Sequence, residues 1–142
     1  MSVPKTMDRM TVGDTLATYE FRVTPEFNRR YLEALEDPHP RYLSASGGRA
    51  VVHPGLLLNQ SNCTRSPGFS LPSGMAAIHA REVTEFLHPA GVNTLLRVHF
   101  RIIDRYRKRD RDYVVVEAVI EDEDGTVIMR RRSANTFSRG GS

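Results

Sequence analysis

The second half of the chain alternates apolar and polar residues over long segments, which is the pattern of strands with one buried and one solvated face. From Leu96 to Ile102, every second residue is apolar and the residues between them are arginine or histidine. A turn signal at Asp124-Gly125 separates two such segments. The pattern predicts a four-strand antiparallel meander, with strands in residues 75–87, 93–109, 111–125 and 126–137.

The first half predicts a strand and a helix. In residues 15–23, apolar and polar side chains alternate well enough to predict a strand. The following Thr24-Pro25 step suits a helix start, because threonine is a good N-cap and proline fits the first helical position. Apolar side chains then fall at helical spacing, and these are Phe27, Tyr31, Leu32 and Leu35.

A proline-rich segment follows this helix. Pro38 and Pro40 push the residues before them out of the helical region, so the first helix must end before Asp37-Pro38. Residues 38–48 form a loop by composition. A second helix opens at Pro54 and carries three leucines, which predicts a short, largely buried helix, and residues 65–74 are again a loop.

This order of elements predicts an α+β hot-dog fold, in which a curved antiparallel sheet wraps around a central helix. At 142 residues the chain is expected to be a single domain spanning residues 1–142. The terminal residues 138–142, SRGGS, are expected to form a frayed tail.

Composition indicates a cytoplasmic protein. Hydrophobic residues make up 39% of the chain, and no stretch approaches the roughly 18 consecutive apolar residues of a membrane span. The N-terminus has no apolar segment of the kind found in secretory signals. Cys63 is the single cysteine and cannot form an internal disulfide, which fits a reducing compartment. We therefore expect no membrane partner.

The formal charge is +3, and much of the basic excess lies in residues 105–112 and 130–132. Clustered arginines can bind phosphates, so a nucleic-acid surface is one interpretation. Aspartates interrupt the first run, however, and it lies between two predicted strands, which favours a solvated hairpin end. We expect no nucleic-acid partner. A third interpretation is that one of these arginines holds the phosphates of coenzyme A.

Two motifs resemble those of a known family. Residues 31–44, YLEALEDPHPRYLS, are similar to the Gly-Asp-x-Asn-Pro-x-His segment of the MaoC-like (R)-specific enoyl-CoA hydratases and 3-hydroxyacyl dehydratases. Residues 51–58, VVHPGLLL, are similar to the start of that family's central helix. The resemblance covers nearly the whole chain and points to the subgroup known as the MaoC N-terminal dehydratase domain.

The resemblance implies roles for particular residues. Asp37 matches the family's catalytic aspartate, Pro40 its proline, and Gly55 the glycine whose amide forms the oxyanion hole. A helix start suits that last role, because its free N–H groups favour negative charge. Tyr42 stands where the family has its catalytic histidine. A tyrosine loses its proton only at about pH 10, so it is a poor base at neutral pH.

The Tyr42 replacement leaves three interpretations open. The chain is a non-catalytic subunit of a heteromer, or the chemistry survives with His39 or His53 in place of the lost histidine, or the substrate is some other acyl or small cyclic compound. The candidate catalytic residues are Asp37, His53 and Tyr42. Candidate oxyanion or substrate-binding residues are Gly55, His39 and Asn59.

Each candidate also has a structural explanation. His39 can be an exposed turn residue, His53 a histidine that bonds the preceding loop, and Asp37 a residue that bonds its own backbone before Pro38. Asn59 lies in a run of four polar residues that face a polar pocket, a dimer interface or solvent. The remaining histidines fall on strands or strand ends and are given no role: His79, His88 and His99.

Other chemistries are disfavoured. The central helix carries no carboxylate, unlike most hot-dog thioesterases, and Cys63 has no evident histidine partner. Nothing has metal-ligand spacing, so neither a metal nor another cofactor is expected. We therefore expect hydration or dehydration of an acyl thioester, carried by coenzyme A or acyl carrier protein, in a pocket at a subunit interface. The alternative is a non-catalytic partner subunit or acyl-binding module. The assembly is a homodimer or a heteromer with a second hot-dog chain.

Overall fold

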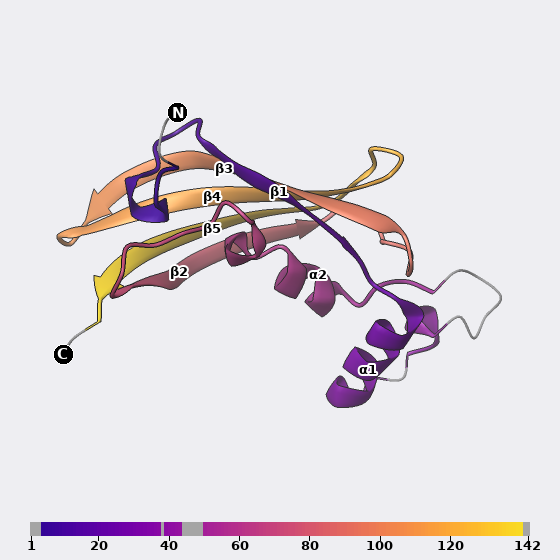
Figure 1. Cartoon of the computed structure of the whole chain (residues 1–142). Helices are drawn as coiled ribbons and strands as arrows, with labels where there is room; N and C mark the ends of the chain where they lie inside the picture. The colour runs from indigo at the N-terminus through magenta and orange to yellow at the C-terminus, as the bar shows by residue number, and fades with distance from the viewer. Residues whose placement is uncertain (1–3, 38, 44–49, 141–142) are drawn as a thin grey trace.

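Five antiparallel strands form one curved sheet in the computed structural model, which describes residues 4–37, 39–43 and 50–140. Figure 1 shows helix α2 beneath the curved face of this sheet and helix α1 beyond its end. The strands are β1 (Thr15–Arg22), β2 (Met75–Phe86), β3 (Leu95–Lys108), β4 (Arg111–Asp122) and β5 (Val127–Arg139). This is the α+β hot-dog arrangement that the order of elements predicts.

The strand order is β1-β3-β4-β5-β2, so the expected four-strand meander is wrong. Only β3, β4 and β5 follow one another as neighbours, while β2 pairs with β5 at one edge and β1 with β3 at the other. Alternation shows which residues face the core but does not identify the neighbouring strand. The connection after β2 crosses the end of the sheet. The Leu87 N–H donates to the Ile128 carbonyl in β5, and the Asn93 N–H donates to the Val23 carbonyl just after β1.

Helix α1 (Pro25–Leu35) begins as predicted, with the Thr24 hydroxyl accepting the Phe27 N–H at 3.1 Å. It ends at Glu36, whose left-handed backbone (φ 57°) turns the chain away before Asp37. Because helix α1 lies beyond the end of the sheet, only part of its row of apolar side chains is covered by the rest of the protein. Leu32 is buried, whereas Phe27 and Leu35 are 41% and 48% exposed.

Helix α2 (Pro54–Gln60) packs its buried leucines, Leu56 and Leu57, into the core of the sheet. Arg131 of β5 is 6% exposed and holds the far end of this helix. Its guanidinium donates to the Leu58 carbonyl at 2.6 Å and to the Ser61 hydroxyl at 3.0 Å, and it pairs with Glu82. The middle arginine of run 130–132 therefore faces the interior rather than a basic surface.

The first basic run is the end of the β3–β4 hairpin, as charge patterning indicates. Arg109 and Asp110 both have positive φ, as the favoured tight hairpin turns require. Arg105 turns back and donates to the carbonyls of Met10 and Asp8. Arg107 pairs with Asp110 and Asp112 within the hairpin, so two of the arginines in this run are engaged by other parts of the protein.

The chain end is better ordered than expected. Ser138 and Arg139 belong to β5 and pair with Ala76 and Met75 of β2, so the expectation of a tail starting at residue 138 is wrong. Residues 141–142 lie outside the described residues. In the part of the chain that the structure describes, no helix is long and apolar enough to cross a membrane.

Candidate active site

Asp37 and His53 lie against each other, with 3.3 Å between Oδ2 of the carboxylate and Nε2 of the imidazole. The left-handed residue that ends α1 lets the Asp37 N–H donate to the Leu32 carbonyl, which fixes the carboxylate just past the helix. His53 is the residue before Pro54 and the N-cap of α2. The His53 side chain is 18% exposed and that of Asp37 is 41% exposed, so water and a ligand can reach the pair.

The other ring nitrogen of His53 determines what the imidazole can do. Nδ1 accepts the N–H of Gly55 at 2.9 Å, so it carries a lone pair and the proton of the neutral ring sits on Nε2. Nε2 is then the nitrogen that faces Asp37 Oδ2, at 3.3 Å. The imidazole therefore lies beside the carboxylate with its N–H side toward it. The amide of Gly55 must exchange its bond to Nδ1 before it can serve the oxyanion role expected for it.

Two tyrosine rings contact the imidazole of His53. Tyr42, from the 3₁₀ turn η2 (Pro40–Tyr42), lies with its ring centroid 4.9 Å from that of His53. Tyr31, from α1, lies at 5.2 Å. The position at which the resemblance implies a catalytic histidine is thus filled by a tyrosine that packs on a histidine from another segment.

Asn28 joins the three segments that carry these side chains. It is 2% exposed. Its Nδ2 donates to the carbonyls of Tyr42 at 3.0 Å and Val51 at 3.4 Å, and its Oδ1 accepts the His53 N–H at 3.3 Å. Neither Asn28 nor the place of Tyr31 beside the pair was predicted from the sequence. Residues 28, 31, 32 and 35 form one i, i+3, i+4, i+7 stripe, which groups Asn28 with buried Leu32 but does not indicate its hydrogen bonds.

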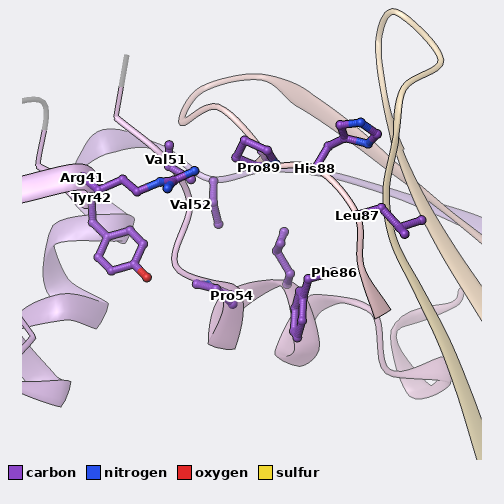
Figure 2. Close-up of a pocket in the computed structure, with 11 residues that line it drawn as sticks. Arg41, Tyr42, Val51, Val52, Pro54, Phe86, Leu87, His88 and Pro89 are labelled. Atoms are coloured by element: carbon purple, nitrogen blue, oxygen red, sulfur yellow. The ribbon is translucent and has the colours of Figure 1, made fainter. Parts of the chain in front are cut away.

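A cavity of about 320 Å³ opens next to this cluster (Figure 2). The hydroxyl of Tyr42 points toward Pro54, the first residue of α2, while Phe86 and Leu87 at the end of β2 form another wall. The rest of the wall is mainly apolar, and it consists of Arg41, Val51, Val52, Leu57, His88, Pro89 and Ala90.

Neither Asp37 nor His53 lines this cavity. Asp37 instead lines a separate hollow beside α1, together with Leu32 and Leu43. Tyr42 connects the pair to the cavity, since its ring contacts His53 and also forms part of the cavity wall. The structure thus brings together Asp37, His53 and Tyr42, and of these three only Tyr42 lines the cavity.

The two remaining candidates lie apart from the pair. His39 is exposed; its Nδ1 caps η2 by accepting the Arg41 N–H at 3.2 Å, and its ring lies 5.8 Å from Tyr42. Asn59 is exposed on α2, where its Oδ1 accepts from Arg65 at 2.8 Å. Neither is part of the cavity wall in Figure 2.

The other chemically reactive residues have structural partners. His79 lies 3.5 Å from Glu82, His99 lies 2.7 Å from Glu121, and His88 Nδ1 lies 2.9 Å from the Val127 carbonyl. Burial raises the pKa of the Cys63 thiol to about 11. Within the described residues, we find no group of three His, Cys, Asp or Glu side chains able to hold a metal ion.

No protein-family model and no curated protein matches the sequence. Solved structures match over nearly the whole chain. A MaoC-like dehydratase from Rhodospirillum rubrum has a TM-score of 0.74 at 18% identity, covering 96% of this chain and 97% of that one. The R-hydratase PhaJ1 from Pseudomonas aeruginosa has a TM-score of 0.68 at 14% identity, with coverages of 94% and 89%. The HadBC 3R-hydroxyacyl-ACP dehydratase complex from Mycobacterium tuberculosis has a TM-score of 0.69 at 16% identity, with coverages of 92% and 99%.

These likenesses establish the hot-dog fold shared with MaoC-like dehydratases and R-hydratases. Thioesterases also match with this fold. The fold therefore does not by itself select the reaction, and the site must do so.

Proposed function

We propose that this protein hydrates 2-enoyl thioesters, and dehydrates 3-hydroxyacyl thioesters in reverse, with Asp37 and His53 as its acid–base pair. The observation that carries the proposal is the 3.3 Å contact between them. The histidine expected after Asp37 is replaced by Tyr42, yet His53 brings an imidazole to the same carboxylate. The site thus supports the interpretation in which His53 takes the catalytic role of the histidine that Tyr42 replaces.

The reaction needs one proton acceptor that later becomes a donor. One carboxylate oxygen of Asp37 faces Nε2 of His53 at 3.3 Å, and the other takes a proton from a water as the water oxygen bonds to the β-carbon. The electrons of the carbon–carbon double bond move to give the enolate of the thioester. The α-carbon then takes the proton from Asp37, so one water is added and no electrons are exchanged. We assign Tyr42 to hold this water at the cavity side.

The cavity suits the apolar acyl chain of such a substrate. Its volume of about 320 Å³ is at the lower end for small-molecule sites. Its walls are mainly aliphatic, with Phe86 and Leu87 at the open rim. We propose that the acyl chain enters this cavity past Tyr42 and that the carrier, coenzyme A or acyl carrier protein, stays outside.

We propose a second hot-dog chain as the partner that completes the pocket. Strand β2 is an edge strand, and such edges invite pairing. Ile78, Val83, Phe86 and Leu87 on or next to it are 42–52% exposed. Because Phe86 and Leu87 also line the cavity, a chain that pairs along β2 would cover both. The assembly would act in the cytoplasm, where its one free thiol, Cys63, stays reduced.

The second candidate is a non-catalytic partner subunit that shapes the acyl pocket of an active chain. Two observations favour it: Tyr42 stands at the expected histidine position, and Asp37 does not line the cavity that Tyr42 lines. The similarity to the HadBC complex is consistent with a heteromer.

One assay separates the two candidates. The purified protein is given enoyl thioesters of several chain lengths, on coenzyme A and on acyl carrier protein, and loss of the conjugated double bond is followed. The proposal expects hydration by the protein alone. Hydration that appears only when a second hot-dog chain with an intact Asp-x-x-x-x-His segment is added would establish the partner-subunit function.

A further inference from the structure

The hydroxyl of Tyr31 lies directly over Gly55 at the start of α2. A methyl group placed on Gly55 would clash with Tyr31 Oη. The Tyr31 ring also contacts the imidazole of His53, at 5.2 Å between centroids. The absence of a side chain at Gly55 therefore lets a phenol oxygen occupy this place beside the Asp37–His53 pair.

Within residues 4–37, 39–43 and 50–140, no hydrogen bond joins this hydroxyl to another residue. The tyrosine ring itself is half-buried and packs against the core. The ring thus holds the hydroxyl in place, and none of the described residues takes its O–H as a hydrogen bond.

The backbone donors nearby are already used. The Gly55 N–H donates to His53 Nδ1 at 2.9 Å, and the Leu56 N–H donates to the His53 carbonyl at 2.9 Å. Pro54 has no N–H. An incoming thioester carbonyl therefore meets no free amide at the first residues of α2, although the reaction places negative charge on its oxygen.

From these contacts we propose that Tyr31 is the hydrogen-bond donor to the thioester oxygen, taking the oxyanion role that the amide of Gly55 does not fill in this structure. The inference rests on the proposed hydration and names a further catalytic residue for it. A donor fixed before the reaction stabilises the enolate oxygen more strongly than the neutral carbonyl, so its contribution appears in kcat rather than in KM.

The direct test is Tyr31→Phe, which removes only the oxygen. We expect kcat to fall about 100-fold with KM changed by less than about threefold, because loss of one oxyanion donor has effects of this size. Tyr106→Phe is the matched control, since Tyr106 stacks on Tyr113 at the far hairpin of β3 and β4 and should leave both constants unchanged. Equal kcat in Tyr31→Phe and Tyr106→Phe would overturn the inference while hydration itself stands.

A binding measurement keeps the inference testable if hydration is not seen. The coenzyme A thioester of 4-dimethylaminocinnamic acid absorbs at longer wavelength when its carbonyl is polarised. We expect this shift with the wild type and its loss with Tyr31→Phe. No hydration but a Tyr31-dependent shift would refute the proposed function and retain the donor, whereas absence of both would refute the two together.

Gly55→Ala provides the second variant. The new methyl would displace the Tyr31 hydroxyl, so Gly55→Ala should lower kcat to the level of Tyr31→Phe, and the double variant should fall no further. Losses that multiply in the double variant would show that the two positions act independently, which contradicts the inference.

Discussion

Asn28 accepts the backbone N–H of His53 on its Oδ1 at 3.3 Å, and this bond ties α1 to the residue that caps α2. Through its Nδ2 the same side chain also holds the carbonyls of Tyr42 and Val51. One buried amide thus positions the backbones of the segments that carry His53 and Tyr42. The geometry of the candidate site depends on it.

Replacement of Asn28 by alanine should therefore destabilise the protein and disturb the site together. Because three partly buried backbone groups lose their hydrogen-bond partner, we expect the free energy of unfolding to fall by about 2–4 kcal/mol. Urea unfolding measures this, with Asn59→Ala on the exposed side of α2 as a control that costs under about 1 kcal/mol. Equal losses in the two variants would show that Asn28 does not hold these segments.

Arg131 should matter far more than its neighbour Arg132. Arg131 is 6% exposed and binds Leu58, Ser61 and Glu82, so Arg131→Ala should cost about 3–5 kcal/mol by leaving buried partners unpaired. The Arg132 side chain is 55% exposed and pairs with Glu117, so Arg132→Ala should cost at most about 1 kcal/mol. Chemical unfolding of both variants checks the ranking, and a reversed order would contradict the buried position of Arg131.

Cys63 should be nearly inert in the native protein at pH 8. Burial raises the pKa of its thiol from 9.0 to about 11, so the reactive thiolate is a small fraction, of the order of one part in a thousand. A disulfide reagent should label the native chain slowly and the chain unfolded in guanidinium at once. Rapid labelling of the native protein at pH 8 would show an exposed thiol instead.

The same shift predicts a loss of stability at alkaline pH. The unfolded chain releases the Cys63 proton above pH 9, but the folded chain keeps it until about pH 11, so stability falls as pH rises across this window. The loss amounts to about 2–3 kcal/mol by pH 11. Unfolding measured at pH 8 and pH 10.5 should show a larger decline for the wild type than for Cys63→Ala, and parallel declines would contradict the raised pKa.

Assembly through β2 predicts a specific disruption. We expect a dimer, and Val83→Lys should dissociate it, because Val83 is 52% exposed on this edge strand. Sedimentation measures the mass, and Val12→Lys, a change at another exposed valine outside β2, should leave it unchanged. A wild-type mass that stays near 16.1 kDa at micromolar concentrations would exclude the dimer.

Alternation was enough to predict the strands, because each one buries alternate side chains against the core. It was not enough to place β2, since pairing with β5 depends on how the chain after Phe86 crosses the sheet. The resemblance singled out Asp37 and Gly55. The contact between Asp37 and His53, however, depends on a left-handed residue, Glu36, that no periodicity indicates.

Contacts between segments that are distant in sequence also explain why Asn28 and Tyr31 were not predicted as site residues. Tyr31 was counted among the apolar positions of its helix, which is correct for its ring, since it packs on the core. Its hydroxyl matters because of Gly55, from a distant part of the sequence. Asn28 lies on the same stripe, but helical spacing alone does not show that a polar residue there will be buried and bonded to three backbone groups.

The most direct test of the central claim is hydration of crotonyl-CoA or a longer enoyl-CoA by two single variants, at Asp37 and at His53. Asp37→Asn should abolish the activity, and His53→Ala should lower it about 100-fold or more, because the two side chains act as one unit. Wild-type activity retained in both single variants would contradict the account.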